Sequence, residues 1–284
     1  MNVRSTPKQV TWLAAVVFAV MVVPAGVWAQ APASETFEPQ AVQHTSIWAT
    51  ATTDVAGHLE PTVVLLGHWA DDPIQLQRRG TDETVARVID DQVKAELGLG
   101  VGLFDRLELG LALPMVVYQR GDPTTVLPEP HTVDLAEARG HVRARLLRRG
   151  GFGLGAQVTG YLPTSTDAPY QSNRQVGATG SLVGDFRASG ALPWHIAANV
   201  GWSFQPSTTE ELLATDDRLD VRLAGEVEVW PERVHVLASA FGRWEVLADP
   251  NVAVSGGYLG GARIVWGDSG LSSTVGAGGG LGGG

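Results

Sequence analysis

Residues 103–119, LFDRLELGLALPMVVYQ, decide the fold because their side chains alternate between two chemical types. From Leu107 to Val117 every second residue is apolar, whereas the residues between are mostly small or polar and include Glu108. A period of two indicates a β-strand, since successive side chains point to opposite faces. Strands of soluble sandwiches usually have about five or six residues, whereas a strand that crosses a bilayer needs roughly nine to eleven. The stretch therefore predicts a membrane-spanning strand.

The rest of the chain repeats this pattern. We expect about twelve strands, of which about eleven are distinct: 62–69, 88–101, 107–119, 141–146, 152–162, 176–186, 196–204, 219–229, 234–244, 252–266 and 271–278. Long polar segments alternate with turns of a few residues, as in outer-membrane barrels with long extracellular loops and short periplasmic turns. The sequence therefore predicts an all-β fold, an antiparallel up-and-down transmembrane β-barrel.

The amino-terminal part has a different composition. Arg4 and Lys8 precede a short apolar run at 13–23, and Val27-Trp28-Ala29 fits a cleavage site, so residues 1–29 are predicted to be a signal peptide. Residues 30–57 are expected to form a loose periplasmic lead-in with a short strand near 45–52, and residues 58–284 the barrel. Because an exported transmembrane β-barrel is typical of the outer membrane, we expect the protein in the cell outer membrane.

Alternation alone does not distinguish a membrane barrel from a soluble one. In a soluble barrel the charged side chains would lie on the outer face, in contact with water. Aromatic residues at strand ends, such as Trp69, Tyr118 and Trp230, favour the membrane barrel, because aromatic girdles lie at bilayer interfaces. In a membrane barrel the charged side chains of the strands line the lumen. The predicted lumen-facing residues are Lys94, Glu96, Glu108, Arg143, Arg145, Asp220, Arg222, Glu226, Glu228 and Arg263.

Composition narrows the possible functions. The net charge of −10 argues against a nucleic-acid partner, since phosphate binding needs a basic surface. The chain has no cysteine, and its seven histidines lack metal-binding spacing. No G-x-S-x-G motif is present either. We therefore expect no enzyme activity, no cofactor and no metal. The expected partners are outer-membrane lipid and the barrel-assembly machinery, while the oligomeric state stays open.

Several segments resemble bacterial outer-membrane β-barrel regions found ahead of OmpA-like domains. They are GLFDRLELGLALP at 102–114 with Tyr118-Gln119, GHWADDP at 67–73, RGGFGL at 149–154 and TGYLPT at 159–164. The resemblance spans roughly 57–284 and implies a barrel with no defined substrate. Such relatives often continue into a peptidoglycan-binding domain and close the barrel with an aromatic strand. This chain ends at the glycine-rich residues 281–284, so either residues 46–53 supply a strand or the chain is truncated.

The sequence leaves three functions open. The first is a channel or porin-like passive transporter for small polar solutes, because a barrel of about this size can hold a narrow polar lumen. The second is a structural or adhesive barrel with a filled lumen. The third is a barrel enzyme acting on lipids, for which His141 and His235 are the candidate residues on or near the lumen parity.

Overall fold

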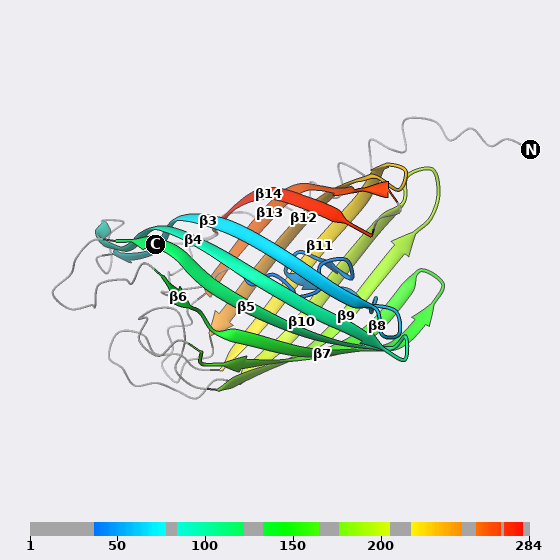
Figure 1. The fold of residues 1–284 in the computed structure, drawn as a ribbon, viewed down its shortest axis with the longest axis horizontal. Helices are drawn as coiled ribbons and strands as arrows, with labels where there is room; N and C mark the ends of the chain where they lie inside the picture. Colours follow the sequence, from blue (N-terminus) through cyan, green and yellow to red (C-terminus); the bar gives the residue numbers. More distant parts are fainter. Residues whose placement is uncertain are drawn as a thin grey trace, which may run out of the picture.

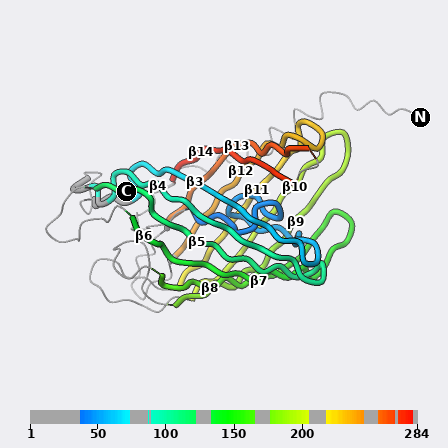
Figure 2. Tube along the Cα trace, viewed as in Figure 1, coloured from blue at the N-terminus to red at the C-terminus, as the bar shows by residue number. Residues whose placement is uncertain are grey.

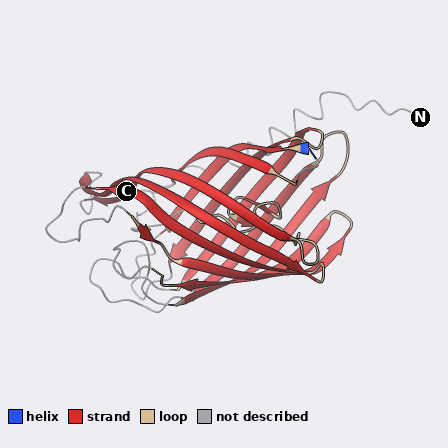
Figure 3. Ribbon diagram, in the orientation of Figure 1, coloured by secondary structure: helices blue, strands red, loops and turns tan. Residues whose placement is uncertain are grey.

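The computed structural model describes residues 37–77, 84–121, 133–164, 176–204, 217–245, 254–267 and 270–280 of the 284-residue chain. The predicted signal peptide and most of the predicted long loops lie outside these residues. Within them the chain is almost entirely β-strand (Figure 3). No helix in the described part is long and apolar enough to cross a membrane.

One antiparallel sheet forms the wall of the molecule and curls around an interior (Figure 1). Its strand order is β14-β13-β12-β11-β10-β9-β8-β7-β5-β4-β3, so strands adjacent in this order follow one another along the chain, and the short β6 (Asp134–Leu135) pairs with β5 beside β7. The wall strands are β3 (Pro61–Gln77), β4 (Thr84–Leu103), β5 (Leu107–Arg120), β7 (Ala138–Arg149), β8 (Phe152–Leu162), β9 (Gly177–Ala188), β10 (Trp194–Phe204), β11 (Arg218–Trp230), β12 (Val234–Glu245), β13 (Val254–Val265) and β14 (Ser272–Gly280). This confirms the predicted all-β, up-and-down antiparallel fold.

The two faces of the wall have inverted polarity. On β5, Leu109, Leu111 and Leu113 lie on the exposed outer face, whereas Glu108 is fully buried on the inner face. The same holds along β8, where Val158 is 57% exposed and Gln157 is buried. Along these strands, therefore, the apolar side chains face outward and the alternating polar and charged side chains face inward.

Short turns join the strands at one end of the sheet. Phe104 and Asp105 between β4 and β5, and Glu232 between β11 and β12, have positive φ angles. Gly150, between β7 and β8, also has φ +58°, a conformation that costs glycine little because it lacks a Cβ. Most residues between strands that are not described belong to the longer connections 78–83, 122–132, 165–175, 205–216 and 246–253, which agrees with the predicted alternation of short turns and long segments.

Residues 37–57, here called the interior segment, lie inside the curve of the wall (Figure 2, blue). They contain a small hairpin of β1 (Ser46–Ile47) and β2 (Thr50–Ala51), turned at Trp48 with φ +53°. The prediction for this region is a loose lead-in with a short strand near 45–52. The hairpin strands pair with each other and are no part of the wall. The interior segment therefore does not supply the closing strand, and no pairing joins β3 to β14 among the described residues.

Several strands are longer than predicted, among them β4 and β7, which extend past the predicted 88–101 and 141–146 at both ends, and β3. The sequence places a loop from Ala70 onward, but β3 continues to Gln77 through Asp71-Asp72-Pro73. Its register with β4 shifts between Asp71 and Ile74, and Asp72 has φ +49°. Proline is tolerated in an edge strand or at a bulge, because no ladder hydrogen bond from its nitrogen is needed there.

Candidate functional site

The interior segment is the most enclosed part of the described chain. Residues 38–42 and 45–53 are buried, although the segment belongs to no strand of the wall. Ile47 is its apolar anchor and packs in one cluster with Ala197, Ala224 and Leu237 of β10, β11 and β12. Hydrogen bonds and ion pairs also hold the segment against the wall.

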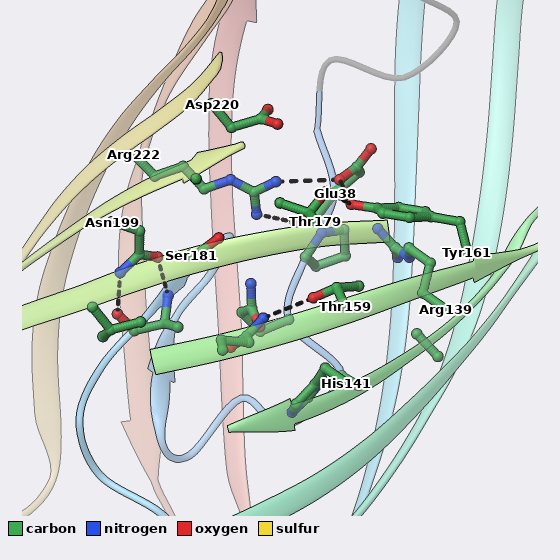
Figure 4. A pocket seen from close by; sticks show the side chains of 18 residues that line it. Glu38, Arg139, His141, Thr159, Tyr161, Thr179, Ser181, Asn199, Asp220 and Arg222 are labelled. Atoms are coloured by element: carbon green, nitrogen blue, oxygen red, sulfur yellow. Dashed lines mark hydrogen bonds and ion pairs between the residues drawn. The ribbon is translucent and has the colours of Figure 1, made fainter. Parts of the chain in front are cut away.

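Glu38 holds the beginning of the segment. Its Oε1 lies 2.7 Å from Arg243 Nη2 on β12, and its Oε2 lies 3.2 Å from Arg222 Nη2 on β11. Arg218 Nη2 is 3.7 Å from Oε1, and the Tyr161 hydroxyl donates to Oε2 at 3.4 Å. Figure 4 shows Arg222 pointing toward Glu38 across the interior. Strands far apart in the sequence thus converge on one carboxylate.

The charge balance of this cluster determines the ionisation of Glu38. Burial alone would raise the pKa of the Glu38 carboxyl, but the guanidinium groups of Arg243, Arg218 and Arg222 outweigh burial and hold the pKa below its ordinary value. Asp220 belongs to the same cluster and accepts hydrogen bonds from Arg243 Nε at 3.0 Å and Arg218 Nε at 3.3 Å. Three guanidinium groups therefore share two carboxylates.

The hairpin is held through its backbone. Asn199 Oδ1 accepts a hydrogen bond from the Ala51 amide at 2.8 Å, and Asn199 Nδ2 donates to the Ala51 carbonyl, also at 2.8 Å (Figure 4). Arg222 Nη1 donates to the Ala49 carbonyl at 2.7 Å, and Arg263 Nη2 to the Ser46 carbonyl at 2.8 Å. These wall side chains satisfy backbone groups that burial would otherwise leave without partners.

A second buried ion pair lies beneath the hairpin. Glu108 pairs with Arg143, and both side chains are almost completely enclosed. Glu108 Oε2 accepts from Thr45 Oγ1 at 2.8 Å, and Arg143 Nη1 donates to Ser46 Oγ at 3.0 Å. His141 Nε2 lies 3.3 Å from Glu108 Oε1. The wall pair thus also binds the segment, which supplies partners that a buried ion pair needs.

The end of the segment is held at β7 and β9. Thr53 donates to Asp185 Oδ2 from its backbone amide at 2.7 Å and from its hydroxyl at 2.8 Å. Asp54 pairs with Arg148 at 2.9 Å and with Arg187. The interior segment is therefore fixed at its beginning, middle and end.

Inward-facing glycines make room for the segment. On β4, a Cβ on Gly98 would overlap the Ala41 carbonyl, and one on Gly102 would overlap the carbonyl oxygens of Ala56 and Gly57. On β13 and β14, a Cβ added to Gly261 or Gly276 would overlap the ring of Trp48. The absence of side chains at these positions leaves space for the interior segment.

The structure brings most of the predicted lumen-facing residues to the inner face. Lys94, Glu96, Glu108, Arg143, Asp220 and Arg263 are buried there, and Arg222 and Glu226 are mostly enclosed. Glu96 pairs with Arg139, and Glu226 with Arg263 at 3.2 Å and with His235 at 2.7 Å. Arg145 and Glu228 lie instead near the short turns, where they contact backbone groups of Asp105 and Glu232.

Sequence reasoning missed Glu38, Asn199, Arg218 and Arg243 as parts of this site. Arg218 continues the parity of Asp220 and Arg222, and Arg243 follows His235 at even spacing, so strand parity could have placed both on the inner face. Glu38 gives no such signal, because the segment around it does not alternate.

A cavity of about 40 Å³ lies in the interior beside the segment. Its lining includes Glu38, Arg139, Tyr161, Thr179 and Asp220 (Figure 4). Within the described residues no group of three or more His, Asp or Glu side chains could hold a metal ion. The polar lining suits binding of a polar or charged group.

No protein-family model matches the chain, and a search of curated proteins also finds no match. The resemblance to barrel regions that precede OmpA-like domains therefore stays a prediction.

Proposed function

We propose that this chain is an outer-membrane β-barrel whose lumen is closed by its own interior segment. The observation that carries the proposal is the inverted polarity of the wall, with apolar side chains outside and buried charges inside. A bilayer favours this arrangement, because lipid covers the outer apolar band and the strands between the edges β3 and β14 satisfy each other's backbone groups.

The apolar outer face of the wall is better suited to contact with lipid than with water. Five outward side chains on four strands, β3, β8, β9 and β10, are each more than half exposed: Val63, Leu65, Val158, Leu182 and Val200. Soluble monomers rarely expose contiguous apolar patches larger than a few hundred Å². Every wall strand has at least nine residues, as a bilayer-crossing strand requires. Export by residues 1–29 and insertion by the barrel-assembly machinery are part of the same proposal.

The interior segment decides between the functions that remain. With residues 38–42 and 45–53 buried in the lumen, the barrel in this state is not an open porin. Passage of small polar solutes requires displacement of the segment. We therefore propose a gated channel, and the second candidate is a structural or adhesive barrel that keeps its lumen filled permanently.

Two measurements test this proposal. Residues 30–284 are refolded into detergent micelles, and gel mobility is compared before and after boiling, alongside circular dichroism. A β-rich spectrum with a mobility shift supports the barrel, whereas an unshifted, aggregated protein contradicts it. Planar-bilayer recordings then compare this chain with a variant lacking residues 37–57. Rare brief openings in the full chain and sustained ones in the variant support the gated channel. Silence in both favours the structural barrel.

A further inference from the structure

The cluster around Glu38 has the composition of a carboxylate-recognition site. Arg243 and Arg222 approach separate oxygens of the Glu38 carboxylate at 2.7 and 3.2 Å, and Arg218 lies 3.7 Å from Oε1. Guanidinium groups match the geometry of carboxylates, and such charge-assisted contacts are stronger than neutral hydrogen bonds. Tyr161 adds a neutral donor at 3.4 Å. All four side chains belong to the wall, whereas their occupant belongs to the interior segment.

The charge of the site changes when the segment leaves. Departure of Glu38 withdraws its carboxylate from all three guanidinium groups, while Asp220 continues to contact Arg218 and Arg243. Uncompensated charge is costly in an enclosed interior, so the vacated site favours an anion. Thr179 and Arg139 line the adjoining cavity, and both extend the polar surface next to the carboxylate position. A small solute with a carboxylate therefore finds both charge complementarity and space.

We propose that Arg218, Arg222 and Arg243 form a binding site for a carboxylate solute, which Glu38 occupies while the interior segment closes the lumen. This inference rests on the proposed function. A solute carboxylate competes with Glu38 for the same guanidinium groups. Binding of the solute stabilises the state in which the segment has left, and the lumen then favours anions over cations.

The experiment follows release of the segment. The chain has no cysteine, so a single Ala49→Cys substitution in the buried hairpin turn reports release through its rate of labelling by a maleimide. Labelling is measured in micelles with sodium acetate, with sodium chloride at the same ionic strength, and with inorganic phosphate. Ser46→Cys is the second reporter, since it is nearly isosteric with the buried serine that it replaces.

Acetate is expected to raise the labelling rate severalfold over chloride, and Arg243→Gln to remove this response. Glu38→Gln raises the rate without acetate by about tenfold or more, because the buried arginines lose their charged partner. Glu228→Gln and Arg145→Gln are the matched controls, since both residues lie near the short turns and contact backbone groups. Neither control is expected to change labelling.

The outcomes separate the two proposals. In a barrel that shows the mobility shift on boiling, equal labelling in acetate and chloride overturns the carboxylate site and leaves the barrel intact. An acetate response that persists in Arg243→Gln also overturns it. An equal response to phosphate broadens the ligand class from carboxylates to oxyanions and overturns the carboxylate preference. Loss of the mobility shift in the unsubstituted chain contradicts the proposed function itself.

Discussion

The Cβ atom of Val42, in the interior segment, lies 3.6 Å from the position that a Cβ would take on Gly100 of β4. The hairpin, all of β3 and most of β4 separate the two residues in the sequence, yet the wall and the segment touch at this point. Disulfide-bonded cysteines have Cβ atoms about 3.5–4.5 Å apart. The contact therefore allows a reversible covalent lock on the segment.

The double substitution Val42→Cys with Gly100→Cys is expected to form a disulfide in the folded protein. Oxidation would then hold the interior segment in the lumen and suppress channel openings, and reduction would restore them. Gel mobility without reductant measures the bond, and planar-bilayer recording measures the openings. Each single cysteine variant is the control. Failure of the oxidised pair to cross-link would mean that the segment does not rest against β4.

Gly102→Ala is expected to destabilise the protein, because the added Cβ would overlap the carbonyl oxygens of Ala56 and Gly57. Overpacking of this kind typically costs about 1–3 kcal/mol. Gly184→Ala on β9 is the matched control, since nothing lies within 4 Å of its added Cβ. Urea midpoints in micelles measure both variants. Equal midpoints would contradict the close approach of the segment to β4.

Asn199→Ala is expected to lower the free energy of unfolding by about 1–3 kcal/mol, because it leaves the buried amide and carbonyl of Ala51 without their partner. Asn199→Asp keeps the acceptor but loses the donor, so we expect an intermediate effect. Ser239→Ala on the neighbouring inner face is the control, since the buried Ser239 hydroxyl has no hydrogen-bond partner within the described part of the chain. A result for Asn199→Ala that equals this control would show that Asn199 does not hold the hairpin.

The low pKa of Glu38 predicts how stability depends on pH. A depressed carboxyl pKa contributes stability fully above the ordinary value of 4.5, and the contribution is lost as pH falls from 4.5 toward the folded-state pKa. At pH 7, Glu38→Gln should cost about 2–5 kcal/mol. Below pH 4.5 the gap between the two proteins should shrink by up to about 1.4 kcal/mol per pH unit.

Urea midpoints from pH 3 to 8 measure the gap, and Glu228→Gln is the control for loss of one carboxylate. A gap that stays constant throughout this range would show that the pKa of the Glu38 carboxyl is not lowered in the folded protein.

Val158→Arg tests the lipid-facing role of the outer surface. Val158 lies in the middle of β8 and is 57% exposed, so in water the substitution should be nearly neutral. In a bilayer, arginine at the midplane costs about 2–4 kcal/mol, but near the interface only about 0–1 kcal/mol. Leu146→Arg, near the short turn after β7, is the control. Equal stability of the two variants in lipid vesicles would argue against a membrane-spanning wall.

Strand parity made the wall predictable. The alternation around Leu111 and Leu113 predicted a strand there. It also predicted which side chains share a face, because successive side chains of a strand point to opposite faces. The same parity placed Glu108 and Arg143 together on the polar side, and adjacent strands bring them into contact. The end of β3 was mispredicted, since a bulge carries the strand past Pro73.

By itself the sequence determined an antiparallel sheet with one apolar and one charged face, since alternation is a local property of consecutive residues. Only the tertiary structure decided that residues 37–57 fill the interior and that Glu38 lies among Arg218, Arg222 and Arg243. The contacts of Glu38 with these arginines join residues more than a hundred positions apart. Their partners are chosen by curvature of the sheet, by space at inward glycines and by charge balance, which no local pattern encodes.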